Sequence, residues 1–127
     1  MRIGRSVHLL RFHRDERLSP HFHGSELVCP CCGVGIIALE LVENLEWLRD
    51  LVGEPLRINS AYRCPVHNAE VGGRPDSYHL LGLAVDVAKP EGVDLVDLAW
   101  KVGFTGIIEY ETFVHMDLRL PPYVQRR

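Results

Sequence analysis

Two histidines and one aspartate stand where their side chains could do metal chemistry. His79 precedes the apolar run Leu83–Ala88, Asp86 interrupts that run, and His115 lies inside the last expected strand, within residues 113–119. Burying a carboxylate without a partner is costly, so Asp86 requires a cation or hydrogen-bond donors beside it. Two imidazoles and a carboxylate on elements that can be neighbours in one sheet match a zinc site with three protein ligands and a fourth position open to water.

Each of these three residues also has a structural interpretation. A single buried histidine is more often a hydrogen-bonded core residue than a metal ligand, and Asp86 could cap a turn or pair with an arginine. The coincidence of three such residues in apolar surroundings argues for a metal, but the spacing alone leaves both interpretations open.

The cysteines form a second group with ligand-like spacing. Cys29-x-x-Cys32 and Cys64-x-x-His67 are spaced as in a small structural zinc site, with Cys31 as a spare or alternative ligand. Such a site would tie the N-terminal part of the chain to the segment around Cys64. Two alternatives stay open, namely a disulfide from Cys64 to one of the other three cysteines, and free thiols buried as small apolar groups.

The elements that must position these residues follow from hydrophobic periodicity and from glycine and proline stops. We expect an irregular N-terminal segment over residues 1–25. The patterns that follow predict helices over residues 38–52, 65–71 and 93–102, a loop over 73–77, strands over 56–59 and 83–88, and a hairpin of 106–110 with 113–119 that turns at Glu111-Thr112. This order indicates an α+β fold, a mainly antiparallel sheet packed with two main helices.

Length and charge bound the possible functions. A chain of 127 residues is one domain. Its net charge of -3, from 14 basic and 17 acidic residues, argues against a nucleic-acid partner. No apolar stretch is long enough to span a membrane, and the charged N-terminus lacks a secretory signal, so we expect a protein that is cytoplasmic as synthesised.

Three runs of the sequence carry a resemblance to a known family. They are NSAYRCPVHN at residues 59–68, VGGRPDSYHLLGLAVD at 71–86 and FVHMDLR at 113–119. Together they resemble the zinc D-alanyl-D-alanine carboxypeptidase family, which includes bacterial DD- and LD-peptidases and phage endolysins and shares its fold with the hedgehog signalling domain. The resemblance implies an N-terminal arm over residues 1–18, a zinc peptidase domain over 19–120 and a C-terminal tail over 121–127.

The resemblance also assigns roles to residues. It implies that His79, Asp86 and His115 bind Zn2+ and that Arg63 holds the carboxylate of the substrate or polarises its scissile carbonyl. An arginine suits that task because its planar guanidinium binds a carboxylate through two hydrogen bonds. The alternative for Arg63 is a structural ion pair with Glu70 or Asp86.

The general base is where this chain departs from better-understood members, which place an acid three residues before the last histidine. Thr112 occupies that position and cannot serve as a base. Strand alternation puts Asp117 on the face of His115, so Asp117 is the first candidate, and Glu111 at the turn is the second. Either could instead be a solvated charge of the hairpin.

The resemblance therefore predicts zinc-dependent hydrolysis of peptide bonds in peptidoglycan stem peptides, by a carboxypeptidase or an endopeptidase of the endolysin type. We expect a monomer that meets the cell wall after release, with no nucleic-acid partner. The competing hypothesis is a non-catalytic, zinc-stabilised binding module or phage structural component on the same fold. The threonine at position 112, where an acid is expected, supports this alternative.

Overall fold

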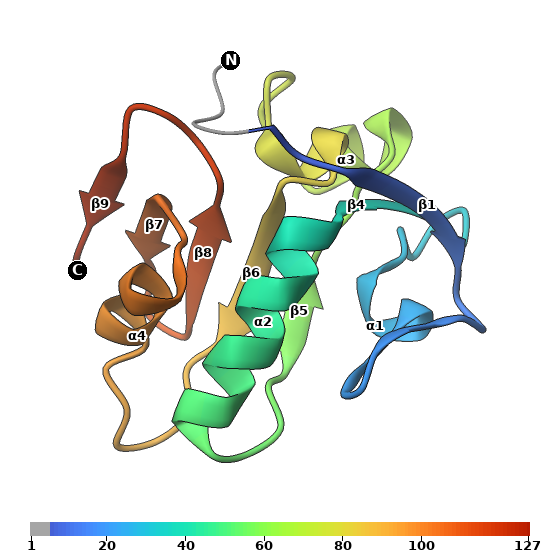
Figure 1. Ribbon diagram of the computed structural model, residues 1–127. Helices are drawn as coiled ribbons and strands as arrows, with labels where there is room; N and C mark the ends of the chain where they lie inside the picture. Colours follow the sequence, from blue (N-terminus) through green and yellow to red (C-terminus); the bar gives the residue numbers. More distant parts are fainter. Residues whose placement is uncertain (1–5) are drawn as a thin grey trace.

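The computed structural model describes residues 6–127 and is built around one five-stranded sheet (Figure 1). In spatial order its strands are β5 (Ile58–Ser60), β6 (Ala84–Ala88), β8 (Phe113–Asp117), β7 (Gly106–Glu109) and β9 (Tyr123–Gln125). All neighbouring strands are antiparallel except β7 and β9, which are parallel. The predicted α+β class with a mainly antiparallel sheet is confirmed.

Two helices lie on the same side of this sheet (Figure 1). Helix α2 (Leu39–Val52) ends at Gly53 and buries Leu41, Leu45 and Leu48 at helical spacing. Helix α4 (Leu95–Val102) begins at Asp94, whose side chain accepts a hydrogen bond from the Asp97 backbone, and ends at Gly103. Both helices lie within the residues predicted for them. No helix among residues 6–127 is long and apolar enough to cross a membrane.

Alternation along the central strands separates the core from the opposite face. The fully buried side chains of Val85, Val87, Val114 and Met116 belong to the hydrophobic core that includes α2 and α4. Because successive side chains of a strand point to opposite faces, Asp86 and His115 point away from the helices. The register pairs Asp86 directly with His115 across β6 and β8, so the fold brings these two side chains together.

Two short helices lie between β5 and β6 in the chain. Helix α3 (Pro65–Glu70) follows β5 and falls within the predicted residues 65–71. The 3-10 helix η1 (Tyr78–Leu81), which the sequence analysis did not predict, carries His79 and ends at Gly82 in the left-handed conformation with φ of 72°. A Cβ at Gly82 would meet the backbone carbonyl of Ile36, so the chain passes close to a neighbouring segment at this point.

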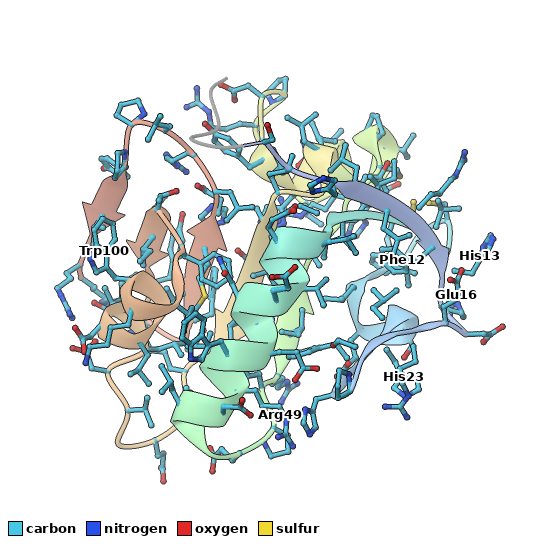
Figure 2. All side chains as sticks on the ribbon, viewed as in Figure 1. Phe12, His13, Glu16, His23, Arg49 and Trp100 are labelled. Carbon is cyan, nitrogen blue, oxygen red and sulfur yellow. The ribbon has the colours of Figure 1, made fainter. Side chains whose placement is uncertain are left out.

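The N-terminal region is more regular than predicted. Within residues 6–25, β1 (Leu9–His13) pairs antiparallel with β4 (Val34–Ala38), and β2 (Arg17–Ser19), β3 (Phe22–His23) and α1 (Gly24–Leu27) follow. The expectation of an irregular segment was wrong for the described residues, and residues 1–5 lie outside them. Phe12 points from β1 towards α1 and is fully buried (Figure 2).

The C-terminal residues also differ from expectation. Residues 121–127, expected as a tail, contain β9, which joins the sheet beside β7. The proposed boundaries at residues 18 and 120 stay a prediction. The described part of the N-terminal arm does not stand apart, however, because β1 pairs with β4 inside the expected domain.

Candidate metal centre and cleft

His79, Asp86 and His115 converge on one point although they come from three different elements. Their ligand atoms all lie within 4.8 Å of one another. His79 Nε2 is 3.2 Å from Asp86 Oδ1, and His115 Nδ1 is 3.0 Å from the same oxygen. The side chains come from η1, β6 and β8 respectively. The structure thus brings together the three residues that the sequence singles out as ligands.

The remote nitrogen of each imidazole has its own partner. His79 Nδ1 donates to the Ala61 carbonyl at 2.6 Å, because a carbonyl oxygen only accepts. His115 Nε2 lies 2.7 Å from Asp117 Oδ2. These contacts orient both rings so that His79 Nε2 and His115 Nδ1 face Asp86. Histidines that bind zinc in proteins are held in this way, by a carbonyl or a carboxylate on the other nitrogen.

The carboxylates of the cluster favour a positive charge beside them. Burial lowers the pKa of His115, but hydrogen bonds to Asp117 and Asp86 outweigh it and raise that pKa to about 9. Burial raises the pKa of Asp86, yet hydrogen bonds from His115 and His79 hold it well below its usual range. The donor set of two imidazole nitrogens and a carboxylate oxygen, with both rings pre-oriented, fits a zinc ion.

Arg63 lies beside this cluster and is held at three points. Its Nη2 is 3.3 Å from Asp86 Oδ2, its Nε donates to Ser60 Oγ at 3.0 Å, and its Nη1 donates to Asn68 Oδ1 at 3.3 Å. Of the two ion pairs considered from the sequence, the one with Asp86 is present, and the Glu70 carboxylate instead lies near His67. Asp86 therefore presents one oxygen to the histidines and the other to Arg63.

A cleft of about 750 Å³ opens over these side chains. Besides the cluster and Arg63, it is lined by a loop and by aromatic and basic side chains, which include Gly73, Arg74, Asp76, Ser77, Tyr78, Tyr110, Phe113, Arg119 and Tyr123. Tyr110 and Phe113 stack at 4.6 Å between ring centroids. Such walls suit a small ligand that carries both a negative charge and apolar groups.

Asp117, the first candidate for the general base, lies behind the cluster. Its side chain is fully buried, and its oxygens accept bonds from His115 and from Arg119, the shortest being 2.6 Å from Arg119 Nη2. Burial raises the pKa of Asp117, and the bonds to His115 and Arg119 outweigh burial and lower it. Asp117 contacts the nitrogen of His115 that faces away from Asp86, which favours an orienting role over proton transfer.

Glu111, the second candidate, lies on the turn between β7 and β8. Tyr110 N–H donates to the Phe113 carbonyl at 2.9 Å, so the turn at Glu111-Thr112 forms as predicted. The Glu111 side chain is 79% exposed, lies 3.7 Å from Arg127 and is not among the cleft-lining residues, although Tyr110 and Phe113 on either side are. Neither predicted acid lines the cleft.

Arg119 is a residue of the site that was not predicted from the sequence. Its guanidinium pairs with Asp117 and lies over the rings of Tyr78 and Tyr123, at 5.0 and 5.5 Å from their centroids. The signal was present, because Asp117-x-Arg119 continues the alternation that places His115 on this face. Tyr78 could have been found from its place beside His79, whereas Tyr123 was hidden in the expected tail.

The four cysteines lie together at a second place. The sulfurs of Cys29, Cys31, Cys32 and Cys64 are all within 4.8 Å of one another. His67, expected as the fourth ligand, is not in this group, and its Nδ1 lies 3.9 Å from Glu70 Oε2. The structure therefore places Cys31, the spare ligand of the sequence analysis, where His67 was expected.

Comparison with known proteins agrees with the geometry. A family model described as Peptidase M15 matches residues 20–117. The matched segment contains the His79, Asp86 and His115 cluster, Arg63 and all four cysteines. No protein with a curated description matches the chain.

Proposed function

The chain belongs to the peptidase M15 family, the zinc D-Ala-D-Ala carboxypeptidase family, whose members are zinc-dependent peptidases. From that premise we propose that it hydrolyses a peptide bond in peptidoglycan stem peptides, with His79, Asp86 and His115 as the zinc ligands. The observation that carries the proposal is the convergence of these three side chains beneath a cleft, with both rings already oriented by outer partners.

A zinc ion held by these residues would act as a Lewis acid on the scissile carbonyl. Arg63 binds the substrate. Of its five N–H donors, three are used by Ser60, Asn68 and Asp86, which leaves two for a carboxylate or a carbonyl oxygen in the cleft. Because those three partners fix the guanidinium, little conformational entropy is lost when the substrate binds.

The two predicted acids take different roles, and only one of them transfers a proton. Asp117 acts as a positioning residue, since it holds His115 through Nε2 and is itself held by Arg119. Glu111 is the proposed base, because it is an exposed carboxylate on the turn whose neighbours Tyr110 and Phe113 line the cleft. A carboxylate there would take a proton from the attacking water and return it to the leaving amine.

The walls of the cleft support a short peptide as substrate. Arg63 and Arg119 supply positive charge, and Tyr110 with Phe113 supplies a stacked apolar surface. A stem peptide offers a carboxylate at one end and small alanine side chains next to the scissile bond. We keep the prediction of a monomer that acts on the cell wall after release.

The test is digestion of purified muropeptides by the zinc-loaded protein, followed by mass spectrometry. We expect loss of a terminal D-alanine or separation of a cross-link, abolished in His115→Ala and strongly reduced in Glu111→Gln. His13→Ala removes an exposed histidine of β1 and serves as the matched control with full turnover. Bound zinc without any product would overturn the proposed activity.

One observation favours a second candidate function, a zinc-stabilised module without catalysis. Neither predicted acid lines the cleft, and Thr112 stands where an acid is expected. Under this alternative the same muropeptides would bind to the zinc-loaded protein without being cut. Calorimetric binding of an intact stem peptide, with no product after prolonged incubation, would identify the module.

A further inference from the structure

We infer that Cys29, Cys31, Cys32 and Cys64 bind a second metal ion, a structural zinc held by four thiolates. The ion would join the turn that precedes β4 to the loop that carries Arg63. This inference does not rest on the proposed hydrolysis, because it concerns residues outside the cleft.

The distances between the sulfurs suit a tetrahedral ion. Cys31 Sγ lies 3.2 Å from Cys64 Sγ and 3.7 Å from Cys29 Sγ, and all four sulfurs lie within 4.8 Å of one another. With Zn–S bonds of about 2.3 Å, the sulfurs of a tetrahedral site are about 3.8 Å apart. The separations of 3.2 and 3.7 Å lie below or close to that value, so small side-chain rotations would complete the site.

The backbone around the cysteines is shaped to support thiolates. The turn at residues 29–33 is closed by a bond from Gly33 N–H to the Cys29 carbonyl at 2.8 Å, and Gly33 has φ of 68°, which glycine adopts without strain. Two backbone N–H groups point at sulfurs, from Cys64 to Cys29 Sγ and from His67 to Cys64 Sγ, both at 3.4 Å. Such hydrogen bonds orient and stabilise metal-bound sulfur.

The charge around the cysteine cluster and its exposure to solvent also fit a zinc ion. A divalent ion with four thiolates carries a net charge of about -2, and the guanidinium of Arg14 lies against the turn, 3.4 Å from where a Cβ of Gly33 would be. Cys29 is buried, whereas Cys31 and Cys32 are exposed, so an ion can enter from solvent. Thiolates select zinc over hard cations such as magnesium or calcium.

The four-sulfur arrangement separates this assignment from the alternatives. A disulfide uses two sulfurs and gives no reason for the other two to meet at the same point. Free thiols buried as apolar groups also fail to account for it, because two of the four are exposed. A single ion accounts for all four sulfurs together.

The site has a consequence for the cleft. Cys64 follows Arg63 directly and caps α3, and α3 supplies Asn68, a partner of the Arg63 guanidinium. An ion on Cys64 would therefore fix the residue next to Arg63 and the start of the helix that supplies Asn68. Losing the ion would therefore loosen this arginine.

The experiment measures metal content and the spectrum of the cobalt-substituted protein. We expect two zinc ions per chain in the wild type and one in either Cys64→Ser or Cys31→Ser. Cobalt in the wild type should give the thiolate-to-metal charge-transfer band in the near ultraviolet, absent from Cys64→Ser and retained in the His79→Ala, His115→Ala double variant. A wild type with one zinc and no such band would overturn the inference.

His67→Ala is the matched control, since the sequence alone suggested His67 as the fourth ligand. We expect it to keep two zinc ions and the charge-transfer band. If His67→Ala loses one ion while Cys31→Ser keeps both, the assignment of four cysteines is wrong.

Thiol titration gives a readout on the wild type that does not depend on how the variants fold. We expect all four thiols of the unreduced, denatured protein to react once a chelator removes the metal, and fewer to react in the native protein without chelator. A denatured protein in which two thiols stay unreactive until a reductant is added contains a disulfide, and that result would contradict the inference.

Discussion

The hydrogen bond between Asp117 and His115 sets which ring nitrogen faces the metal position. Asp117 Oδ2 accepts from Nε2 at 2.7 Å, so Nδ1 is left to face Asp86. Arg119 in turn fixes Asp117 through Nε and Nη2. The orientation of one proposed ligand thus depends on a hydrogen-bonded chain that runs from Arg119 through the buried Asp117 to His115.

Asp117→Asn tests this chain of contacts. An amide in place of the carboxylate makes a weaker partner for Nε2 and lowers the basicity of the ring, so we expect zinc affinity to fall by roughly 10- to 100-fold. Competition with a chromophoric chelator measures the change. Glu111→Gln is the control with unchanged affinity, and equal affinity in both variants would show that Asp117 does not position the ligand.

At the level of individual residues, the sequence predicts that His79, Asp86 and His115 lie close together, because each is a polar residue in apolar surroundings. It also predicts that Asp117 shares the face of His115. It does not tell on which side of the imidazole Asp117 lies, since that depends on a rotamer and on Arg119. The assignment of Asp117 as base stays a prediction, and its contact with Nε2 favours an orienting role instead.

Between elements, Gly82 is the point where the segment carrying His79 meets the junction of β4 and α2. Its carbonyl accepts from Ala38 N–H at 2.9 Å, and a Cβ would meet the Ile36 carbonyl. Gly53, at the end of α2, has a similar φ of 82° but nothing within 4 Å of its Cβ position. The two glycines share a left-handed backbone and differ in what surrounds their Cβ positions.

Gly82→Ala is therefore expected to destabilise the protein more than Gly53→Ala. Left-handed backbone costs a non-glycine residue about 1 kcal/mol, and the clash at Gly82 should bring the total to at least about 2 kcal/mol. Urea unfolding of both variants measures the difference. Equal losses would mean that the backbone relaxes freely around Gly82.

A second contact between elements links the start of β1 to the first turn of α2. His8 donates its backbone N–H to Glu40 Oε1 at 2.8 Å, and its Nδ1 lies 2.7 Å from Oε2. Burial raises the pKa of Glu40, but the bonds from the backbone and ring of His8 lower it to about 2. The hydrogen bond to Glu40 raises the pKa of His8 above its ordinary 6.5.

This pair predicts a pH window for stability. The contribution of Glu40 is present above its ordinary pKa of 4.5 and is lost as the pH falls towards about 2. The contribution of charged His8 is present below pH 6.5 and is lost as the pH rises through its raised pKa. Both contributions are therefore complete between about pH 4.5 and 6.5.

Glu40→Gln should destabilise the protein modestly in that window, because His8 is mostly exposed and solvent screens the pair. The difference from the wild type should shrink on both sides of it. Urea unfolding from pH 3 to 8 measures the profile, and Asp50→Asn, an exposed change on the same helix, is the control. A cost independent of pH would show that the charges contribute nothing.

Some helices and strands can be recognised from the sequence pattern of their own residues, and others cannot. Helices α2 and α4 were predicted because apolar residues recur at helical spacing and glycines follow. Strands β1 and β9 were missed because each is stabilised by a partner distant in the chain. In β1 the burial of Phe12 alone gives too little periodicity to recognise.

For the molecule as a whole, two sites of different chemistry lie on either side of Arg63. The His79, Asp86 and His115 cluster is formed by the central strands and η1, and its geometry follows from the register of β6 and β8. The cysteine cluster joins two segments more than thirty residues apart, Cys29–Cys32 and Cys64. Membership of the peptidase family supports the first site. For the cysteines, the sequence alone left three possibilities open, namely a metal site, a disulfide and free thiols.

The proposed hydrolysis depends on a single metal position shared by His79, Asp86 and His115. The most direct test is diffraction from crystals of the zinc-loaded protein at the zinc absorption edge. We expect an anomalous peak within about 2.0 to 2.3 Å of His79 Nε2, a carboxylate oxygen of Asp86 and His115 Nδ1. Crystals grown with excess zinc that show no peak among these three side chains would contradict it.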